Sequence, residues 1–433
     1  MVAFSNRLYI LGRQRLTSSD LTVGGGTPTV DFAYGKGVWL WDRSGRRFLD
    51  CTSQSWALYL GHSHDEIAEH AAGVMRRYWH VHQGFATDVR EQFATKLLNL
   101  VPNNATRSRY GQVAFTATSG LAIESAIKLA VLNRPTRHVV GRVEGGFHGT
   151  TLGTAQLSWP AQEEVSLRQR TLLPFKPFGP DTFTLAFPSA DPADRTALEQ
   201  AIAELNRQLD PVAHELVAVV VEPIQGSGGQ REVPRSWLQA LIERANDSGF
   251  AVIFDEIQTY MRAGRYYSHL ELEPHFVVLG KGLCGGFNCG AVLLRSDMHG
   301  FPEVGTYDLH TFATSGLSHS VGLKLLEIVE RDDVLSNVRQ RGAQLRATVE
   351  SWCRGGVVFD DVRQVGLHVG LRVIGGDAVA SRLRQHCVEH GLLVGMGGYD
   401  PSVIKIKPPL NITDAETSEI LKRLEQAGGD LST

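Results

Sequence analysis

The chain has 433 residues, of which 42% are hydrophobic and 21% are charged, and this composition is typical of a globular protein and excludes a disordered or fibrous one. Its length suggests two domains. The formal net charge of −3 makes nucleic acid and anionic membrane surfaces poor candidates for partners. The five cysteines form no C-x-x-C pair, and no apolar run has the length of a signal peptide or membrane span, so we expect a soluble, cytoplasmic protein.

The N-terminal segment predicts irregular structure followed by a hairpin. Residues 1–35 show no clear period and contain the run Gly24-Gly25-Gly26. Residues 37–42 and 47–50 then alternate in character on either side of the turn signal Asp42-Arg43-Ser44-Gly45. This pattern predicts a β-hairpin.

From about residue 65, helical stretches alternate with short apolar strands, which favours βαβ units and a largely parallel sheet. Because the strand candidates are apolar almost throughout, we expect them to be covered on both faces. The predicted strands are 113–116, 138–140, 216–221, 251–255, 276–279 and 291–294, and the predicted helices are 123–132, 195–209 and 236–246. Residues 160–190 contain several prolines and are predicted to form a long surface excursion.

The C-terminal part of the chain predicts a smaller α/β domain. Two amphipathic helices, at about 319–330 and 334–353, lead to a strand, a helix, two strands and a last helix over 413–426.

Two strand ends have the most informative chemistry. Asp255 ends one apolar strand, and Lys281 directly follows another, between Gly280 and Gly282. Ligands of α/β proteins bind at the carboxyl ends of parallel strands, and a lysine buried there loses its charge readily and can form a Schiff base. The flanking glycines would let a ligand approach closely. The alternative is an ordinary strand-end ion pair, which is common for either residue alone.

Two further loops suit a flat, phosphorylated ligand. Thr118-Ser119-Gly120 lies between a strand and a helix and could bind an anion, or could be an ordinary helix cap. Phe147 lies in a glycine-rich loop and could stack on a ring or fill a gap in the core.

Other motifs are less informative. The run Gly280–Gly285 matches G-x-G-x-x-G, but a turn and a strand follow it, so a dinucleotide site is excluded. The pairs His62/His64 and His80/His82 could bind a metal, but hydrogen-bonded or solvated loop histidines fit better, because no third ligand set with helix spacing accompanies them. We therefore expect no metal.

Taken in order over residues 35–425, the motifs resemble those of the class III pyridoxal-phosphate aminotransferases, the group of ornithine, 4-aminobutyrate and omega-amine transaminases. The resemblance rests on Leu60-Gly61-His62-Ser63-His64, Thr118-Ser119-Gly120, Phe147-His148-Gly149, Val221-Glu222-Pro223-Ile224-Gln225-Gly226, Asp255-Glu256-Ile257-Gln258-Thr259, Leu279-Gly280-Lys281-Gly282-Leu283, His310-Thr311-Phe312 and Pro408-Pro409-Leu410.

The resemblance implies the α/β transferase fold of type I. A large domain over 61–315 would contain a mostly parallel seven-stranded sheet, and a small α/β domain would combine residues 1–60 with 316–433. It also implies a homodimer with active sites at the interface.

The implied activity moves an amino group between an amine or amino-acid donor and the carbonyl of a small molecule, with pyridoxal 5′-phosphate as cofactor. A racemase or epimerase, a decarboxylase, an aminomutase or a lyase remains an alternative, because each of these needs the same electron sink. A protein that binds the cofactor without catalysis is a further alternative, which the intact set of motifs disfavours.

The resemblance also implies a role for each cofactor-site residue. Lys281 would hold the cofactor as an imine, and Asp255 would pair with the pyridine nitrogen. Gln258 would hydrogen-bond the ring hydroxyl, while Phe147 and Ile257 would cover the two ring faces. The phosphate would be bound by Ser119, Gly120 and Leu121, with Thr311 reaching it from the neighbouring subunit. His148 and Glu222 complete the expected cofactor-binding set.

The chain departs from the family pattern at several points. Its phosphate loop and the segment after Gln258 are each one residue short, and Thr314-Ser315-Gly316 replaces the usual G-N-P. Lys405 stands where the family has an arginine that binds a substrate carboxylate, and a lysine offers a point charge instead of a fork. Trp56 and Tyr59 fall in the segment that lines the substrate pocket in relatives. We therefore expect a specialised substrate, such as an amino sugar or a modified amine.

Overall fold

The computed structural model describes residues 30–78, 80–82, 84–101, 109–159, 173–189, 191, 193–302, 308 and 310–432. The glycine run at 24–26 and much of the predicted surface excursion lie outside the described residues.

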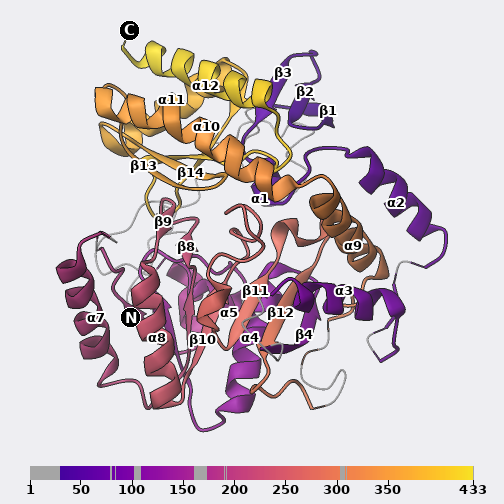
Figure 1. The fold of residues 1–433 in the computed structure, drawn as a ribbon, viewed down its shortest axis with the longest axis vertical. Helices are drawn as coiled ribbons and strands as arrows, with labels where there is room; N and C mark the ends of the chain where they lie inside the picture. The colour runs from indigo at the N-terminus through magenta and orange to yellow at the C-terminus, as the bar shows by residue number, and fades with distance from the viewer. Residues whose placement is uncertain are drawn as a thin grey trace.

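A seven-stranded sheet forms the centre of the larger part of the molecule (Figure 1). Its strand order is β4-β12-β11-β10-β7-β5-β6, in which β12 is antiparallel to both neighbours and the other adjacent pairs are parallel. The strands are β4 (Tyr110–Thr116), β5 (Val139–Val143), β6 (Thr182–Leu185), β7 (Leu216–Val221), β10 (Ala251–Asp255), β11 (Phe276–Leu279) and β12 (Gly290–Arg295). The predicted large, mostly parallel sheet is confirmed.

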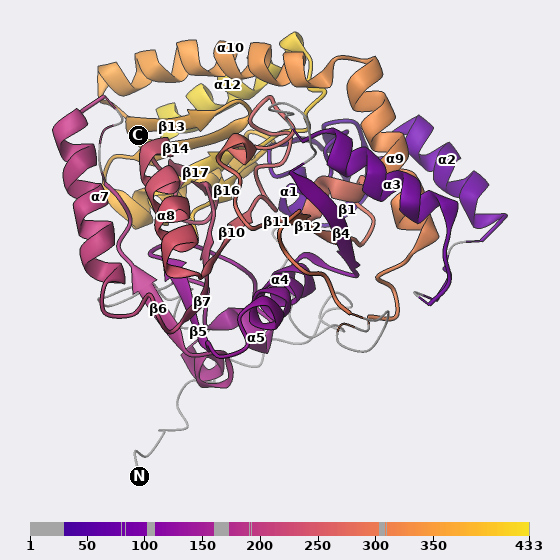
Figure 2. The same ribbon diagram turned by 60° about the horizontal axis from the view of Figure 1, so that its bottom comes forward.

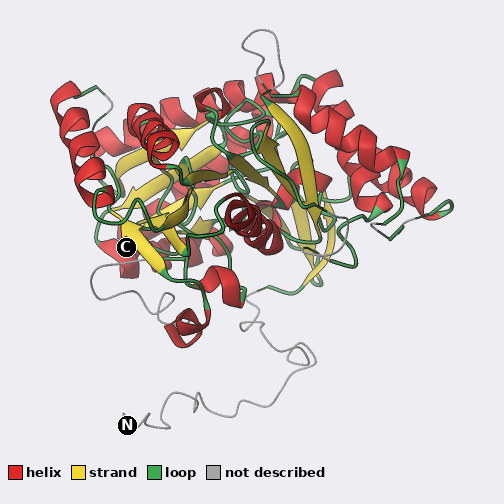
Figure 3. Ribbon diagram, turned by 90° about the horizontal axis from the view of Figure 1, so that it is seen from below, coloured by secondary structure: helices red, strands yellow, loops and turns green. Residues whose placement is uncertain are grey.

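Helices cover both faces of this sheet, as the view from below shows (Figure 3). Residues Val219 and Val221 of β7 share one core with α7 (Arg195–Leu209) and α8 (Arg235–Ser248). The intervening Val220 shares another core with α4 (Ser119–Asn133). Because successive strand residues face opposite sides, a strand buried on both faces must be apolar throughout, as the sequence predicted.

The smaller part of the molecule combines both ends of the described chain, and it lies above the large sheet in Figures 1 and 2. One sheet has the order β1-β2-β3-β15, and β15 pairs in parallel with β3. A second, antiparallel sheet has the order β13-β14-β17-β16. Their elements are β1 (Phe32–Lys36), β2 (Trp39–Asp42), β3 (Arg47–Asp50), β13 (Phe359–Val365), β14 (His368–Val373), β15 (Leu392–Leu393), β16 (Gly395–Met396) and β17 (Val403–Ile406), with the helices α10 (Val334–Gly355), α11 (Gly376–Glu389) and α12 (Asp414–Gly429).

The remaining elements are short or lie beside the main sheet. Helix α9 (Gly316–Arg331) packs against α2 (Asp65–Met75) and α3 (Asp88–Asn99). The others are α1 (Ser53–Trp56), α5 (Leu152–Ala155), β8 (Ile224–Gln225), β9 (Arg231–Glu232) and the 3₁₀ turns Leu173–Phe178, Leu270–Leu272, Lys281–Cys284 and Asp430–Ser432. No helix in the described part of the chain combines the length and the apolar composition needed to cross a membrane.

Two predictions about the elements were wrong. The supposed surface excursion contains β6, a short edge strand in which only Leu185 is buried, so its sequence lacks the apolar run of a central strand. The order strand, helix, strand, strand, helix after 353 missed a hairpin, because β13 and β14 pair with each other before α11 begins. Gly366, with a φ of 58°, turns the chain between them.

Candidate active site

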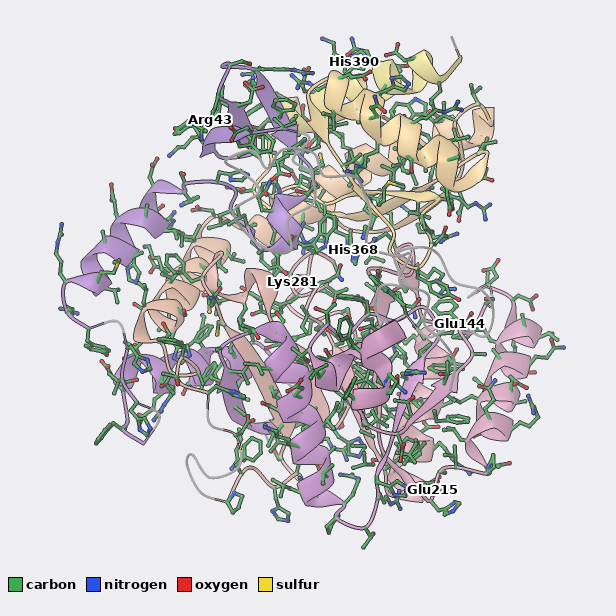
Figure 4. All side chains as sticks on the ribbon, turned by 180° about the vertical axis from the view of Figure 1, so that it is seen from behind. Arg43, Glu144, Glu215, Lys281, His368 and His390 are labelled. Atoms are coloured by element: carbon green, nitrogen blue, oxygen red, sulfur yellow. The ribbon has the colours of Figure 1, made fainter. Side chains whose placement is uncertain are left out.

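The carboxyl ends of β4, β5, β10 and β11 and the loops that follow them surround a cavity of about 290 Å³. In Figure 4 the labelled Lys281 lies between the large sheet and the smaller part of the molecule. The lining residues are Thr118, Ser119, Gly120, Phe147, His148, Gly149, Thr150, Thr151, Asp255, Ile257, Gln258 and Lys281.

Asp255 and Lys281 meet at this cavity because β10 and β11 are parallel neighbours. Asp255 is in register with Val278, three residues before Lys281. Burial lowers the pKa of the Lys281 amine, while the carboxylates of Asp255 and Glu222 act in the opposite direction. A lysine in this setting has a larger neutral fraction than an exposed lysine, as a nucleophile or base requires.

Two hydrogen bonds orient the Asp255 carboxylate. Nδ1 of His148 donates to Oδ2 over 2.8 Å, and the backbone N–H of Ile257 donates to Oδ1 over 3.0 Å. Both Asp255 and His148 are buried. Each oxygen of the carboxylate thus accepts one hydrogen bond, and the group is fixed at the end of β10.

The glycines beside Lys281 make room for protein side chains, which differs from the expectation that they admit a ligand. A Cβ at Gly280 would collide with Ser119, and a Cβ at Gly282 would collide with the ring of Tyr59. Oγ of Ser119 also accepts a hydrogen bond of 3.2 Å from the backbone N–H of Lys281. The lysine is therefore held close to the N-terminus of α4.

The N-terminus of α4 forms the part of the cavity wall beside Lys281. The helix begins at Ser119, and the side chain of its N-cap residue, Thr118, makes no capping hydrogen bond. The first amides of the helix are therefore open to an anion, which argues against the alternative of an ordinary cap. Leu121, which was also expected to bind the phosphate, is not among the lining residues.

The Phe147 loop is tied to the sheet by buried hydrogen bonds. Oε1 and Oε2 of Glu222 accept the backbone N–H groups of Phe147 and Gly226, each over 2.8 Å. Burial and the nearby Asp255 raise the pKa of Glu222. The ring of Phe147 lies 4.9 Å from that of Trp159, at a tilt of 36°. Glu222 therefore holds the Phe147 loop through hydrogen bonds to its backbone and does not itself line the cavity.

The three predicted substrate residues lie beside the lining set. Trp56 is partly exposed, and the ammonium groups of Lys405 and Lys407 lie 4.9 and 4.7 Å from the centre of its ring. Tyr59 is fully buried under Gly282, and burial raises its pKa to about 12. The guanidinium of Arg262 lies 5.0 Å from the Tyr59 ring.

Thr311 is exposed and does not line the cavity of its own chain. The motifs place it at the phosphate of a neighbouring subunit. No group of three or more histidine, cysteine or acidic side chains that could hold a metal occurs among the described residues. His62 instead pairs with Asp50 over 3.0 Å.

Sequence reasoning missed several residues of this region. Gly149, Thr150 and Thr151 line the cavity, and their place directly after the Phe147-His148 motif was an available signal. Trp159, which packs on Phe147, lies in a segment without a recognisable pattern. Lys407 had no expected role in the cofactor site, yet its Nζ donates to Oε1 of Gln258 over 3.0 Å.

The groups that line the cavity suit pyridoxal phosphate. A lysine, a carboxylate held at a strand end, an aromatic ring and an open helix N-terminus surround one cavity, and these groups match an aldehyde, a pyridine nitrogen, a flat ring and a phosphate.

Comparisons with known proteins agree with this chemistry. A family model described as aminotransferase class-III matches residues 22–427. The chain is 30% identical over 413 residues to an acetylornithine aminotransferase of Agrobacterium fabrum, which covers 93% of this chain and 94% of the relative. It is 28% identical over 408 residues to a diaminobutyrate–2-oxoglutarate aminotransferase of Rhizobium meliloti, with coverage of 89% and 85%.

Solved structures show the same fold. An omega-aminotransferase from Paracoccus denitrificans has a TM-score of 0.82 at 21% identity and covers 96% of this chain and 98% of its own. An ornithine aminotransferase from Toxoplasma gondii, with pyridoxal phosphate at partial occupancy in its active site, has a TM-score of 0.79 at 24% identity, with coverage of 96% and 95%.

The chain belongs to the class III aminotransferases. It is a pyridoxal-phosphate-dependent aminotransferase of fold type I, as the motifs implied.

Proposed function

We propose that the cavity at the carboxyl ends of β10 and β11 is the catalytic site, with Lys281 and Asp255 as its catalytic residues. The observation that carries this proposal is the convergence of a partly buried lysine and an oriented carboxylate on one cavity. Ser119, Gly120 and the backbone of Leu121 bind the cofactor phosphate. Phe147 and Ile257 cover the ring faces, and Gln258 donates to the ring oxygen.

The cofactor, when bound, supplies an electron sink for the breaking Cα–H bond of the donor. Asp255 keeps a proton on the pyridine nitrogen through its negative charge, and His148 holds Asp255 in the required orientation. Lys281 carries the proton that leaves the donor Cα. Its lowered pKa supports this role, because only the neutral amine can accept a proton.

The amino donor in this proposal bears a carboxylate, which Lys405 receives beside Trp56. The buried ammonium of Lys405, 4.9 Å from the Trp56 ring, supports this assignment. The names of the relatives, which specify diaminobutyrate and acetylornithine, point to donors of the same kind. A 2-oxo acid is the matching carbonyl acceptor.

We also propose a homodimer that shares its active sites. Phe312 is 62% exposed although it is a large apolar residue, and it follows Thr311, which does not line its own cavity. Burial of Phe312 against a second copy would bring Thr311 to the partner's phosphate site.

The assignment of Lys281 is tested by borohydride reduction of the loaded protein, followed by peptide mapping. Cofactor is expected on Lys281 alone, and Lys281→Ala should retain cofactor through non-covalent contacts only. Cofactor on any other lysine would refute the assignment.

The reaction type is tested by incubation with alanine and pyruvate, of which only one carries an isotopic label in its carbon skeleton. Transamination moves nitrogen from alanine to pyruvate and so carries the label from one compound to the other, whereas racemisation does not.

A further inference from the structure

Lys407 directly follows β17 and is fully buried. Its Nζ donates a hydrogen bond of 3.0 Å to Oε1 of Gln258, a residue 149 positions earlier in the chain. It is therefore a buried amine from the smaller part of the molecule that touches a residue lining the cavity of the larger part.

The backbone of Lys407 is fixed on both sides. Its N–H donates to the carbonyl of Cys51 over 2.8 Å, and its carbonyl accepts a hydrogen bond of 2.7 Å from Oγ of Ser53. The Trp56 ring lies 4.7 Å from the ammonium. The long side chain thus has little freedom to leave Gln258.

The Gln258 amide is equally confined. It packs against the backbone of Gly226, where a Cβ would collide with the amide group. Since the amide has one acceptor oxygen and one donor NH₂ group, a bond from Lys407 to the oxygen determines which end of the amide faces away from Lys407. That end is the NH₂ group, and an ionised ring oxygen of the cofactor can only accept hydrogen bonds.

We propose that Lys407 is a positioning residue that locks the Gln258 amide with its NH₂ group toward the cofactor ring oxygen. The inference rests on the proposed role of Gln258. Without Lys407 the amide could rotate and present its carbonyl to the negatively charged oxygen, which would repel it.

The charges around Lys407 are compatible with this role. Burial and the neighbouring Lys405, Arg262 and Lys281 lower the pKa of Lys407, whereas Glu222 acts in the opposite direction. His368 is the further titratable group that faces it. An amine keeps N–H donors in both its charged and neutral states, so Oε1 of Gln258 has a donor in either case.

A double-mutant cycle on the loaded protein tests the proposal. The visible absorbance of the bound cofactor, followed against pH, gives the pKa of its linkage to Lys281. A hydrogen bond to the ring oxygen withdraws negative charge from that oxygen and so lowers the pKa of the linkage. Gln258→Leu and Lys407→Met should therefore each raise this pKa by about one unit, which is the effect of losing one hydrogen bond to a charged oxygen. In the Gln258→Leu background, Lys407→Met should cause little further change.

Lys405→Met is the charge control, because Lys405 is a buried lysine over the same Trp56 ring. Its effect acts through space and should be equal in both backgrounds. If Lys407→Met shifted the pKa equally in both backgrounds, the positioning role would be overturned. If Gln258→Leu itself changed nothing, the proposed role of Gln258 would fail instead.

A second variant leaves Lys407 untouched in case its replacement prevents folding. Gln258→Glu keeps an acceptor for Lys407 but presents a carboxylate oxygen to the cofactor. We expect a cooperative melting transition at or above that of the unchanged protein, together with roughly tenfold weaker cofactor binding. Unchanged affinity would show that the NH₂ group is not needed and would overturn the proposal.

Discussion

Each carboxylate oxygen of Asp255 accepts one hydrogen bond, so a substitution at this position can change both the charge and the number of acceptors. The Nδ1–H of His148 and the backbone N–H of Ile257 would both find an acceptor only if the residue at 255 offers two oxygens. An asparagine offers one, so it can keep one of the two bonds and cannot carry the negative charge.

Asp255→Asn should therefore keep the cofactor bound while the turnover falls by a factor of roughly a thousand, because the pyridine nitrogen loses its counter-charge. Stopped-flow absorbance with an amine donor measures the half-reaction directly. Near-normal turnover would assign the role to another carboxylate, and Glu222 is the nearest candidate. His148→Asn, which keeps an N–H donor at shorter reach, should have the smaller effect of the two.

Lys405 can be tested by the charge of the donor. Lys405→Ala should raise the apparent KM for a donor with a carboxylate, such as glutamate, by roughly tenfold and leave a neutral amine unchanged. Lys405→Arg should retain or improve the use of the acidic donor, because the guanidinium fork binds a carboxylate through two bonds. Equal effects of Lys405→Ala on both kinds of donor would mean that Lys405 supports the fold only.

At the scale of elements, the sequence predicted the buried strands best. Strands β7, β10 and β11 begin and end where the apolar runs do, since full burial on both faces requires such runs. Strand β6 was missed because an edge strand needs few apolar residues. The β13–β14 hairpin was missed because the burial of its first strand is mixed, with no clean alternation.

Two helical glycines offer a matched test of packing. A Cβ at Gly342 in α10 would lie 2.6 Å from the carbonyl oxygen of Gly366 in the turn between β13 and β14. A Cβ at Gly73 in α2 would meet nothing within 4 Å. The close approach of α10 to the hairpin turn therefore depends on the absence of a side chain at 342.

Gly342→Ala should lower the free energy of unfolding by about 1–3 kcal/mol, because backbone atoms must shift. Gly73→Ala should raise it by up to about 1 kcal/mol, because alanine is the better helix former. Chemical denaturation of the two variants gives both values. Stabilisation by Gly342→Ala would mean that α10 can move away from the turn without loss.

At the scale of the whole molecule, the sequence predicted the residues at strand ends but not the contacts between distant segments. Asp255 and Lys281 follow apolar runs, so their meeting at one edge follows from the parallel sheet. The bond between Lys407 and Gln258 joins segments 149 positions apart, and no periodicity or motif encodes such a contact. The contacts of the Trp56 ring with Lys405 and Lys407 have the same origin.

The proposed dimer can be tested at Phe312. Phe312→Asp should shift the sedimentation profile toward monomer, because burying an unpaired charge in the interface is costly. It should also weaken cofactor binding, because Thr311 would no longer reach the phosphate site of the second copy. Val357, which is 74% exposed beyond α10, supplies the control. Val357→Asp should leave both properties unchanged. A Phe312→Asp protein with the sedimentation and cofactor affinity of the unchanged protein would contradict the shared site.

The pairing of β15 with β3 has a consequence for synthesis on the ribosome. The hairpin of β2 and β3 emerges first, and β3 cannot pair with β15 until the C-terminal part of the chain has been made. Arg46, in the turn between β2 and β3, likewise donates to the carbonyl of Val388, 342 positions later. Lys407 emerges later still. A nascent chain can complete the large sheet before it can close the region around Gln258. A chain that ends before Lys407 therefore lacks the bond to Gln258 that we propose for the finished cofactor site.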